Sequence, residues 1–350
     1  MVDAIAGPRD GAFRRHRPSP RARSRTLGRR VSIDLAFDDA QEGIATALSQ
    51  FCEESCNPET VKALTGKFPE ALWRDLAQLG ILAAGSEESE GGPCEIVAAM
   101  ETLGFAAFPG PLAATFLATQ LVDTKERVEL AEGRTIVAVG RPPLLPFAKE
   151  ASIFLEIEGE EIYRVRPLCE VECVQALGGE AWGRVECERI EHFEDSASAL
   201  ALYRIALSAY LVGVGDGLLR AAVSHAATRK QFGQPIGQFQ AVAHPLADGH
   251  VRLEAARLLT RSAASRLEGD LDTASSEARA AHYSARRAAV EVAHSCHQVF
   301  GAIGITLEGP AFQFSRRIMQ LAALAPPPEV TAEGLFRQTR LAAQTREERP

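Results

Sequence analysis

The stretch from Arg229 to Gln240 combines the residue types best suited to binding a charged ligand. It reads Arg-Lys-Gln-Phe-Gly-Gln-Pro-Ile-Gly-Gln-Phe-Gln and interrupts two long helical patterns. An arginine beside a glycine turn suits an anion, because the guanidinium makes paired hydrogen bonds and the bare backbone allows close approach. The stretch is therefore a candidate phosphate site. The alternative is an ordinary surface Arg-Lys pair beside a turn.

A second stretch, from Gln298 to Thr306, places two glycines at the end of another helical pattern. The Gln298 amide can donate and accept hydrogen bonds, which suits a ring system or a ribose. A helix that simply ends on glycine is the alternative interpretation.

Together the two stretches resemble the signatures of the acyl-CoA dehydrogenase family, over roughly residues 32–325. The family's first signature is matched by Arg229, Gln231–Gly233, Pro235-Ile236, Phe239-Gln240, Leu246–Asp248 and Ala255–Arg257. Its second signature is matched by Gln298, Gly301, Ala302, Gly304, Thr306 and Glu308.

The resemblance implies a flavoprotein that removes two hydrogens from an acyl-CoA and passes electrons to an electron-transfer flavoprotein. It also implies which residues hold the adenine dinucleotide end of FAD, across a dimer interface and for the partner's flavin. These are Arg229, Phe232, Gln240, Gln298, Gly301, Ala302 and Gly304.

The catalytic base of the family has no counterpart here. The family uses a glutamate, because the proton beside the thioester is barely acidic. One expected base position holds Tyr203, and the other falls within residues 325–328, at Pro326. A tyrosine is too weak a base to replace a carboxylate without a large pKa shift. Glu329 and Glu333 are the nearest carboxylates.

The segment that touches the flavin ring in the family is also missing around residues 139–143. The residues expected to hold the dinucleotide tail are present, whereas those expected to contact the flavin ring and to act as the base are missing. This combination resembles the base-lacking subunits of heteromeric acyl-CoA dehydrogenases. A paralogous partner subunit would then supply the base. The alternatives are a self-sufficient dehydrogenase that uses Glu329 or Glu333, a flavin-free scaffold of the same fold, and a flavin oxidase or monooxygenase.

The elements around these stretches follow from local patterns. Apolar residues recur at helical spacing over residues 38–52, 69–79 and 93–122, with Asp38 or Asp39 as a cap and Gly80 as a stop. Short alternating segments then predict four to six strands of one small antiparallel sheet, at residues 135–139, 153–157, 161–165, 170–174 and 184–190. Long helical segments follow, broken at 233–237, 269–273 and 301–310.

The order predicts a mainly α fold with a small β domain, as in acyl-CoA dehydrogenases. We expect a disordered basic extension (1–30), an N-terminal helical domain (31–122), a β domain (123–195), a four-helix bundle (196–325) and a tail (326–350) that includes one polar helix at 331–344.

Charge and cysteine content limit the kinds of partner and the cellular compartment that we expect. Residues 1–30 carry +7 and the remaining residues −15, so the acidic body is a poor nucleic-acid binder. No apolar run is long enough for a membrane span. Seven cysteines without a secretory signal favour the cytoplasm. We expect no metal site and interpret the Cys52/Cys56 and Cys169/Cys173 pairs as buried apolar residues.

Overall fold

The structure is a computed structural model. It describes residues 35–86, 89, 91–176, 179–267, 269–307, 309–324 and 334. The expected extension over residues 1–30 lies outside the described residues. So does the expected final helix over 331–344, apart from Gly334.

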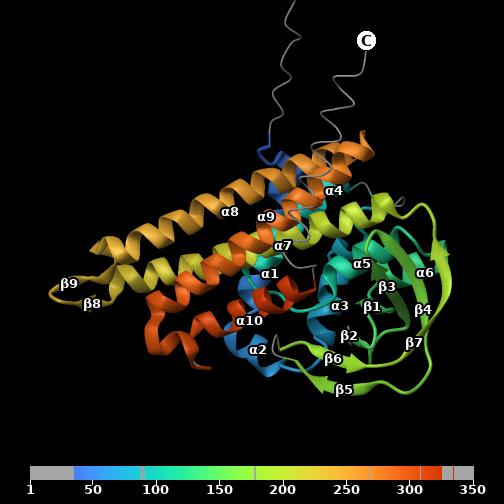
Figure 1. The fold of residues 1–350 in the computed structure, drawn as a ribbon, viewed down its shortest axis with the longest axis horizontal. Helices are drawn as coiled ribbons and strands as arrows, with labels where there is room; N and C mark the ends of the chain where they lie inside the picture. Colours follow the sequence, from blue (N-terminus) through green and yellow to red (C-terminus); the bar gives the residue numbers. More distant parts are fainter. Residues whose placement is uncertain are drawn as a thin grey trace, which may run out of the picture. The chain divides into compact units, whose positions relative to one another are not determined.

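Short helices form the first part of the described chain (Figure 1). They are α1 (Asp39–Ser55), α2 (Pro58–Ala63), α3 (Glu70–Gln78), η1 (Ile81–Ala83), α4 (Pro93–Phe105), α5 (Leu112–Thr119) and α6 (Thr124–Ala131). The Asp38 side chain accepts a hydrogen bond from the Gln41 backbone N–H, so the expected cap of α1 is confirmed. Gly80, with φ 77°, adopts the left-handed conformation that follows a helix end.

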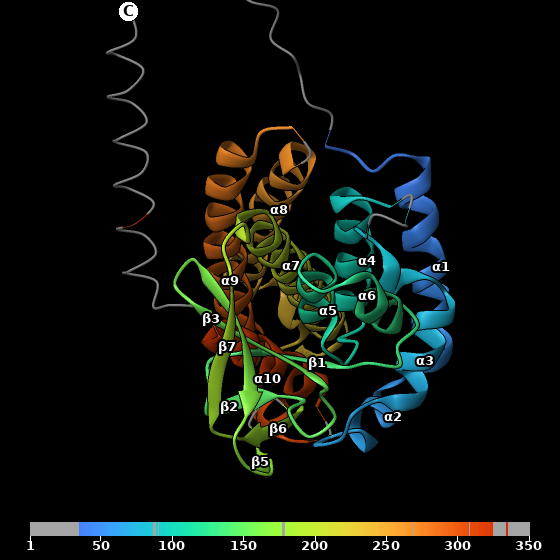
Figure 2. The ribbon, with the colours of Figure 1, turned by 90° about the vertical axis from the view of Figure 1, so that its right-hand side faces the viewer.

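The middle region forms two small sheets rather than the single antiparallel sheet expected from the alternation. Its strands are β1 (Val137–Gly140), β2 (Leu144–Pro146), β3 (Ile153–Glu158), β4 (Glu161–Pro167), β5 (Glu172–Gln175), β6 (Ala181–Arg184) and β7 (Cys187–Phe193). Their orders are β1-β3-β4-β7 and β2-β6-β5. Strands β1 and β3 are neighbours and run parallel. Between them the chain passes through β2 in the other sheet and returns, so that β3 begins at the same end of the sheet as β1. Figure 2 shows both sheets.

Within the described residues, the C-terminal region is a bundle of four helices, as expected. They are α7 (Ala197–Thr228), α8 (Gln240–Leu267), α9 (Leu271–Phe300) and α10 (Pro310–Ala323). Helices α7, α8 and α9 pack side by side (Figure 1). By length and composition α7 could cross a membrane, but 78% of its most apolar window is buried inside the protein. Helix α7 is therefore a core helix of this fold.

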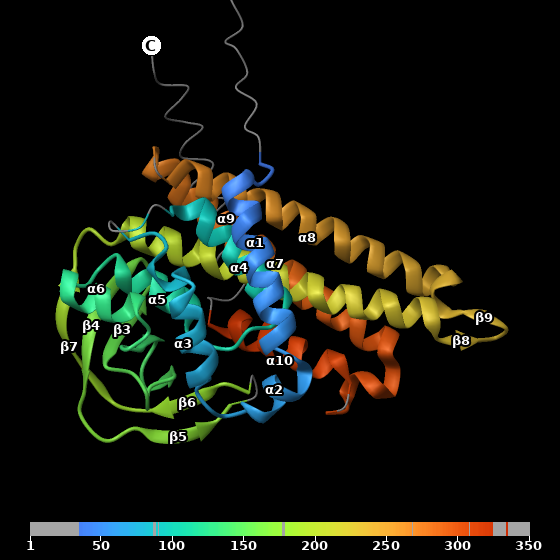
Figure 3. The ribbon, with the colours of Figure 1, turned by 180° about the vertical axis from the view of Figure 1, so that it is seen from behind.

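Helix α4 crosses α7 at very short range, as seen from behind in Figure 3. The contact depends on Gly104, Gly213 and Gly217, because a Cβ at each would meet the backbone of the facing helix. On the neighbouring helix α8, Arg257 and Arg261 donate to the buried Glu101 carboxylate of α4 at 3.1 and 2.8 Å. Close backbone contact and a buried ion pair thus fix α4 against the bundle.

The cysteine interpretation was right for one pair and wrong for the other. Cys52 and Cys56 are buried, whereas Cys169 and Cys173 are exposed. Cys173 lies on β5, which is an edge strand that pairs only with β6, so its alternation does not bury it. Within the part of the chain that the structure describes, no three metal-ligating side chains gather.

We predict that Gly213→Ala lowers the free energy of unfolding by about 1–3 kcal/mol, because the added methyl group forces α4 and α7 apart. The matched control is Gly43→Ala on α1, where a Cβ has open space around it. That change is expected to leave stability unchanged or to raise it by up to about 1 kcal/mol. Urea unfolding followed by circular dichroism measures both. Equal effects of the two substitutions would contradict the tight crossing.

Candidate functional site

The first signature folds into a hairpin between α7 and α8. Strand β8 (Lys230–Gln231) pairs with β9 (Gln234–Pro235), and the tip residues Phe232 and Gly233 have φ of 52° and 81°. Positive φ at both central residues is the geometry of a tight hairpin turn. The Ile236 backbone N–H donates to the Arg229 carbonyl at 2.8 Å, which holds the hairpin on the end of α7. Gln240 is the first residue of α8.

The second signature lies at the same end of the bundle. The Phe300 ring, at the end of α9, packs on the His225 ring of α7 with centroids 5.1 Å apart. Gly301 ends α9 with φ 60°, and a Cβ there would meet nothing within 4 Å. Gly304 differs, since its Cβ would meet Phe300 and His297 at 3.0 to 3.2 Å. Gly304 is therefore needed for packing, and Gly301 faces open space.

We name this end of the bundle the signature end, defined by residues 229–240 and 298–307. Arg229, Gln240, Gln298 and Ala302 are exposed. The Arg229 guanidinium has no ion pair within the described parts of the chain, so it is free to bind a phosphate. Exposed polar side chains are what the dinucleotide tail of FAD would need here, and their role in binding it stays a prediction. Gly304 is buried against Phe300 and His297, and its expected role in FAD binding stays a prediction.

Large apolar side chains surround these polar groups. Phe232 is 92% exposed and Ile305 77% exposed, with Ile303 and Leu307 about half exposed. Large exposed apolar side chains on the two signature stretches are a feature of surfaces that bind a partner.

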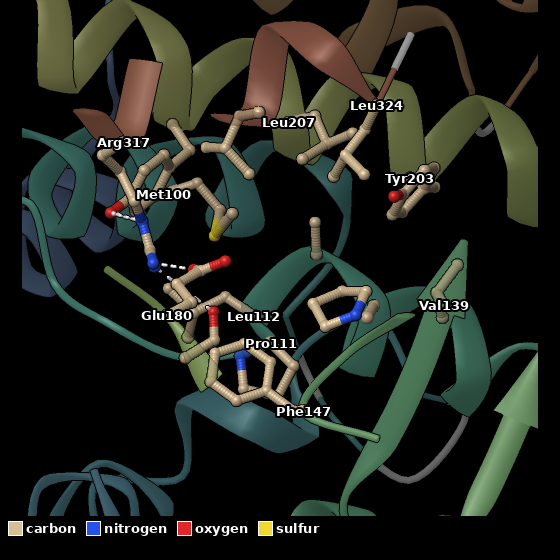
Figure 4. Close-up of a pocket in the computed structure, with 16 residues that line it drawn as sticks. Met100, Pro111, Leu112, Val139, Phe147, Glu180, Tyr203, Leu207, Arg317 and Leu324 are labelled. Atoms are coloured by element: carbon tan, nitrogen blue, oxygen red, sulfur yellow. Dashed lines mark hydrogen bonds and ion pairs between the residues drawn. The ribbon is translucent and has the colours of Figure 1, made fainter. Parts of the chain in front are cut away.

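A small cavity lies beside the N-terminal half of α7, which contributes Tyr203, Leu207 and Tyr210 to it, away from the signature end (Figure 4). It has a volume of about 50 Å³ and is lined mainly by apolar side chains. They come from α4, α5, α7, α10 and β1, and include Met100, Leu112, Val139, Leu207 and Leu324.

A buried ion pair occupies one end of this cavity. Arg317 on α10 contacts the Glu180 carboxylate, and Gln320 donates to the same carboxylate. The Arg317 guanidinium also donates to the Tyr210 hydroxyl and to the Phe108 carbonyl, each at 3.0 Å. Burial lowers the pKa of Arg317, so its charge depends on the neighbouring carboxylate.

Sequence reasoning missed this pair. Glu180 follows a glycine in a short loop, and no local pattern links it to an arginine 137 positions later.

The residue at the expected base position, Tyr203, lines the other end of the cavity near Leu324 (Figure 4). Burial raises the pKa of its phenol to about 12, with Arg204 opposing the shift. A phenol with this pKa stays protonated near neutral pH and does not accept a proton from a thioester. The other position, Pro326, lies outside the described residues together with Glu329 and Glu333.

Comparisons with known proteins agree with this arrangement. The model of the acyl-CoA dehydrogenase C-terminal domain matches residues 193–335, and that of the N-terminal domain matches residues 38–123. The chain is 27% identical to acyl-CoA dehydrogenase IpdE2 of Mycolicibacterium smegmatis, over 83% of this chain and 96% of the relative.

Solved structures share the fold. The ChsE4-ChsE5 complex from Mycobacterium tuberculosis matches with a TM-score of 0.74 at 24% identity, covering 91% of this chain and all of that chain. Butyryl-CoA dehydrogenase from Megasphaera elsdenii matches with a TM-score of 0.71 at 20% identity, covering 86% and 98%.

The helix–sheet–helix order, the two signatures and the domain matches place this chain in the acyl-CoA dehydrogenase family. It is a member of a family of FAD-dependent oxidoreductases. The expected fold class is therefore confirmed.

One titratable group near Tyr203 gives a pH test. Arg204 pairs with Glu160 at 2.7 Å, and His282 on α9 faces Arg204 and Arg286. Burial and these two cations lower the pKa of His282 to about 3. The histidine is therefore neutral in the folded protein, while the unfolded chain takes up a proton near pH 6.5. Stability contributed by neutral His282 is present above pH 6.5 and is lost as the pH falls towards 3.

We predict that the wild-type chain loses about 1–2 kcal/mol more stability between pH 7 and pH 5 than His282→Gln does. Urea unfolding at the two pH values measures the difference. Parallel losses in the two proteins would show that His282 titrates normally in the folded state.

Proposed function

We propose that this chain is the non-catalytic subunit of a heteromeric acyl-CoA dehydrogenase, which completes the FAD site of a paralogous subunit. In this role its signature end binds the dinucleotide tail of a flavin whose ring lies in the partner. The partner also supplies the carboxylate base. The flavin, when bound, accepts the hydride from the acyl chain, and an electron-transfer flavoprotein takes the electrons onward.

The observation that supports a flavin shared with another chain is the distance along α7 between the cavity and the signature end. Tyr203 lines the cavity, and Thr228 immediately precedes the hairpin that carries the signature. At 1.5 Å per residue the two are separated by roughly 37 Å of unbroken helix. One extended dinucleotide cannot span that distance. The signature end therefore suits a flavin that belongs to another chain.

The cavity favours an unlike partner over a second copy of this chain. Its volume of about 50 Å³ is a third of an engineered cavity of about 150 Å³ that binds benzene. The phenol of Tyr203 stands where some family members place the base. A second copy would bring the same cavity and the same phenol, and so would not complete a catalytic site.

The surface around the signature end supports an obligate partner. Phe232 and Ile305 are 92% and 77% exposed in the single chain, and burial of these apolar side chains in an interface would be favourable. The family resemblance to ChsE4-ChsE5, whose structure is a complex of two chains, agrees with an assembly of unlike subunits.

The acyl group of the substrate is assigned only by class. One solved structure that shares the fold is a variant of the Tcur3481-Tcur3483 steroid ACAD, with a TM-score of 0.77 at 20% identity over 87% of this chain and 98% of that chain. A bulky, steroid-like acyl-CoA bound by the partner is our working assignment.

Expression of the chain alone and together with a paralogous subunit tests the proposal. We expect the chain alone to purify without the flavin absorbance near 450 nm, to the eye colourless. Co-expression is expected to yield a yellow complex that bleaches when its acyl-CoA substrate is added. A yellow, bleachable protein from this chain alone would contradict the non-catalytic role.

We also predict that Arg229→Met in this chain weakens FAD binding by the complex by about tenfold to a hundredfold, because a charge-assisted contact to a phosphate is lost. The matched control is Arg74→Met on α3, which removes another exposed arginine from a helix remote from the signature end. Its flavin affinity is expected to equal that of the wild type. Flavin fluorescence during dilution measures the dissociation of FAD from the wild-type complex and from both variants. An equal loss in both variants would indicate a general effect of charge.

A further inference from the structure

The Glu180–Arg317 pair is a charged pair in a cavity whose other lining is mainly apolar. Apart from the pair and the two tyrosines, the cavity is lined by aliphatic, methionine, proline and phenylalanine side chains and by Gly110. Such a lining binds a hydrocarbon chain. The pair stands at one end, opposite Tyr203, and Figure 4 shows the two charged side chains pointing at each other there.

The pair is firmly held. Each side chain is about 5% exposed, and the Arg317 guanidinium donates to three further groups, the Tyr210 hydroxyl and the Phe108 and Gly110 carbonyls. Tyr210 in turn donates to the Phe108 carbonyl at 2.8 Å. An entering alkyl chain would have to break these contacts without replacing any hydrogen bond. Leaving a buried charge unpaired is strongly unfavourable.

A second, more polar cavity lies behind the pair. It has a volume of about 40 Å³, shares Phe147, Glu180 and Arg317 with the first, and is lined by Lys67 and Gln313 among others. The pair therefore separates an apolar space from a polar one. Removal of both side chains would join the two spaces into a longer tunnel.

We propose that the Glu180–Arg317 pair blocks this cavity and prevents an acyl chain from binding to this subunit. The inference rests on the proposed function, because it explains how a subunit without a base avoids holding substrate unproductively. The block is a property of this chain's own residues and does not involve the flavin.

Binding of thioesters to the purified full-length chain tests the block. Isothermal titration calorimetry compares octanoyl-CoA with free CoA, so that the ratio of the two affinities reports the acyl chain alone. For the wild-type chain we expect a ratio within threefold of one. For Glu180→Ala/Arg317→Ala we expect octanoyl-CoA to bind at least tenfold more tightly than CoA.

A second double variant tests the same point if the first one does not fold. Glu180→Val/Arg317→Leu removes both charges and keeps apolar groups in their place, a kind of exchange that is often neutral for stability. Because it opens less space, we expect at least a threefold preference for butyryl-CoA over CoA. The matched control is Glu126→Ala/Arg164→Leu, which removes a partly buried ion pair between α6 and β4. Its ratio is expected to equal that of the wild type.

Two results would overturn the proposal. A wild-type chain that prefers octanoyl-CoA tenfold would show that the cavity is open. A folded double variant without any preference, or a control variant with the same preference, would show that this pair is not the block. The proposed subunit role is tested separately by flavin content, so either hypothesis can fail without the other.

Discussion

Helix α7 is the constraint on which the arrangement depends, because it runs unbroken from the cavity to the signature end. Its position is fixed by the close crossing with α4, where Gly213 and Gly217 leave no room for a side chain. Most of α7 is buried, so neither end can shift without disturbing the core. A rigid helix of this length keeps the signature end away from the chain's own cavity.

Two buried charge clusters stabilise this arrangement in different ways. Glu101 joins α4 to α8 through Arg257 and Arg261, and so orders the bundle behind the crossing. The Glu180–Arg317 pair joins the loop before β6 of the small three-stranded sheet to α10 and lines one end of the cavity. Burying charges is costly unless they are paired, so each cluster fixes its elements in one arrangement. The signature end contains no such buried charge pair among the described residues. Its polar and apolar side chains are exposed together.

Local signals in the sequence predicted the longer helices and both signature stretches, but not the short helices α2 and α6. Asp38 caps α1, Gly80 follows α3, and the hairpin tip at Phe232-Gly233 lies where the glycine turn was expected. The sheet was mispredicted, because alternation reveals that a strand is half buried but not the direction of its neighbour. The roles assigned to Arg229 and Gln298 remain predictions. The Glu180–Arg317 pair could not be predicted, since its contact depends on the tertiary packing of α10 against a loop.

The flavin content of the complex with a paralogous partner tests the central claim most directly. If this chain completes only the partner's site, quantitative flavin release should give one FAD per pair of unlike chains. Arg229→Met in this chain should lower that value. One FAD per chain, or flavin retained fully by this chain in the absence of any partner, would contradict the account.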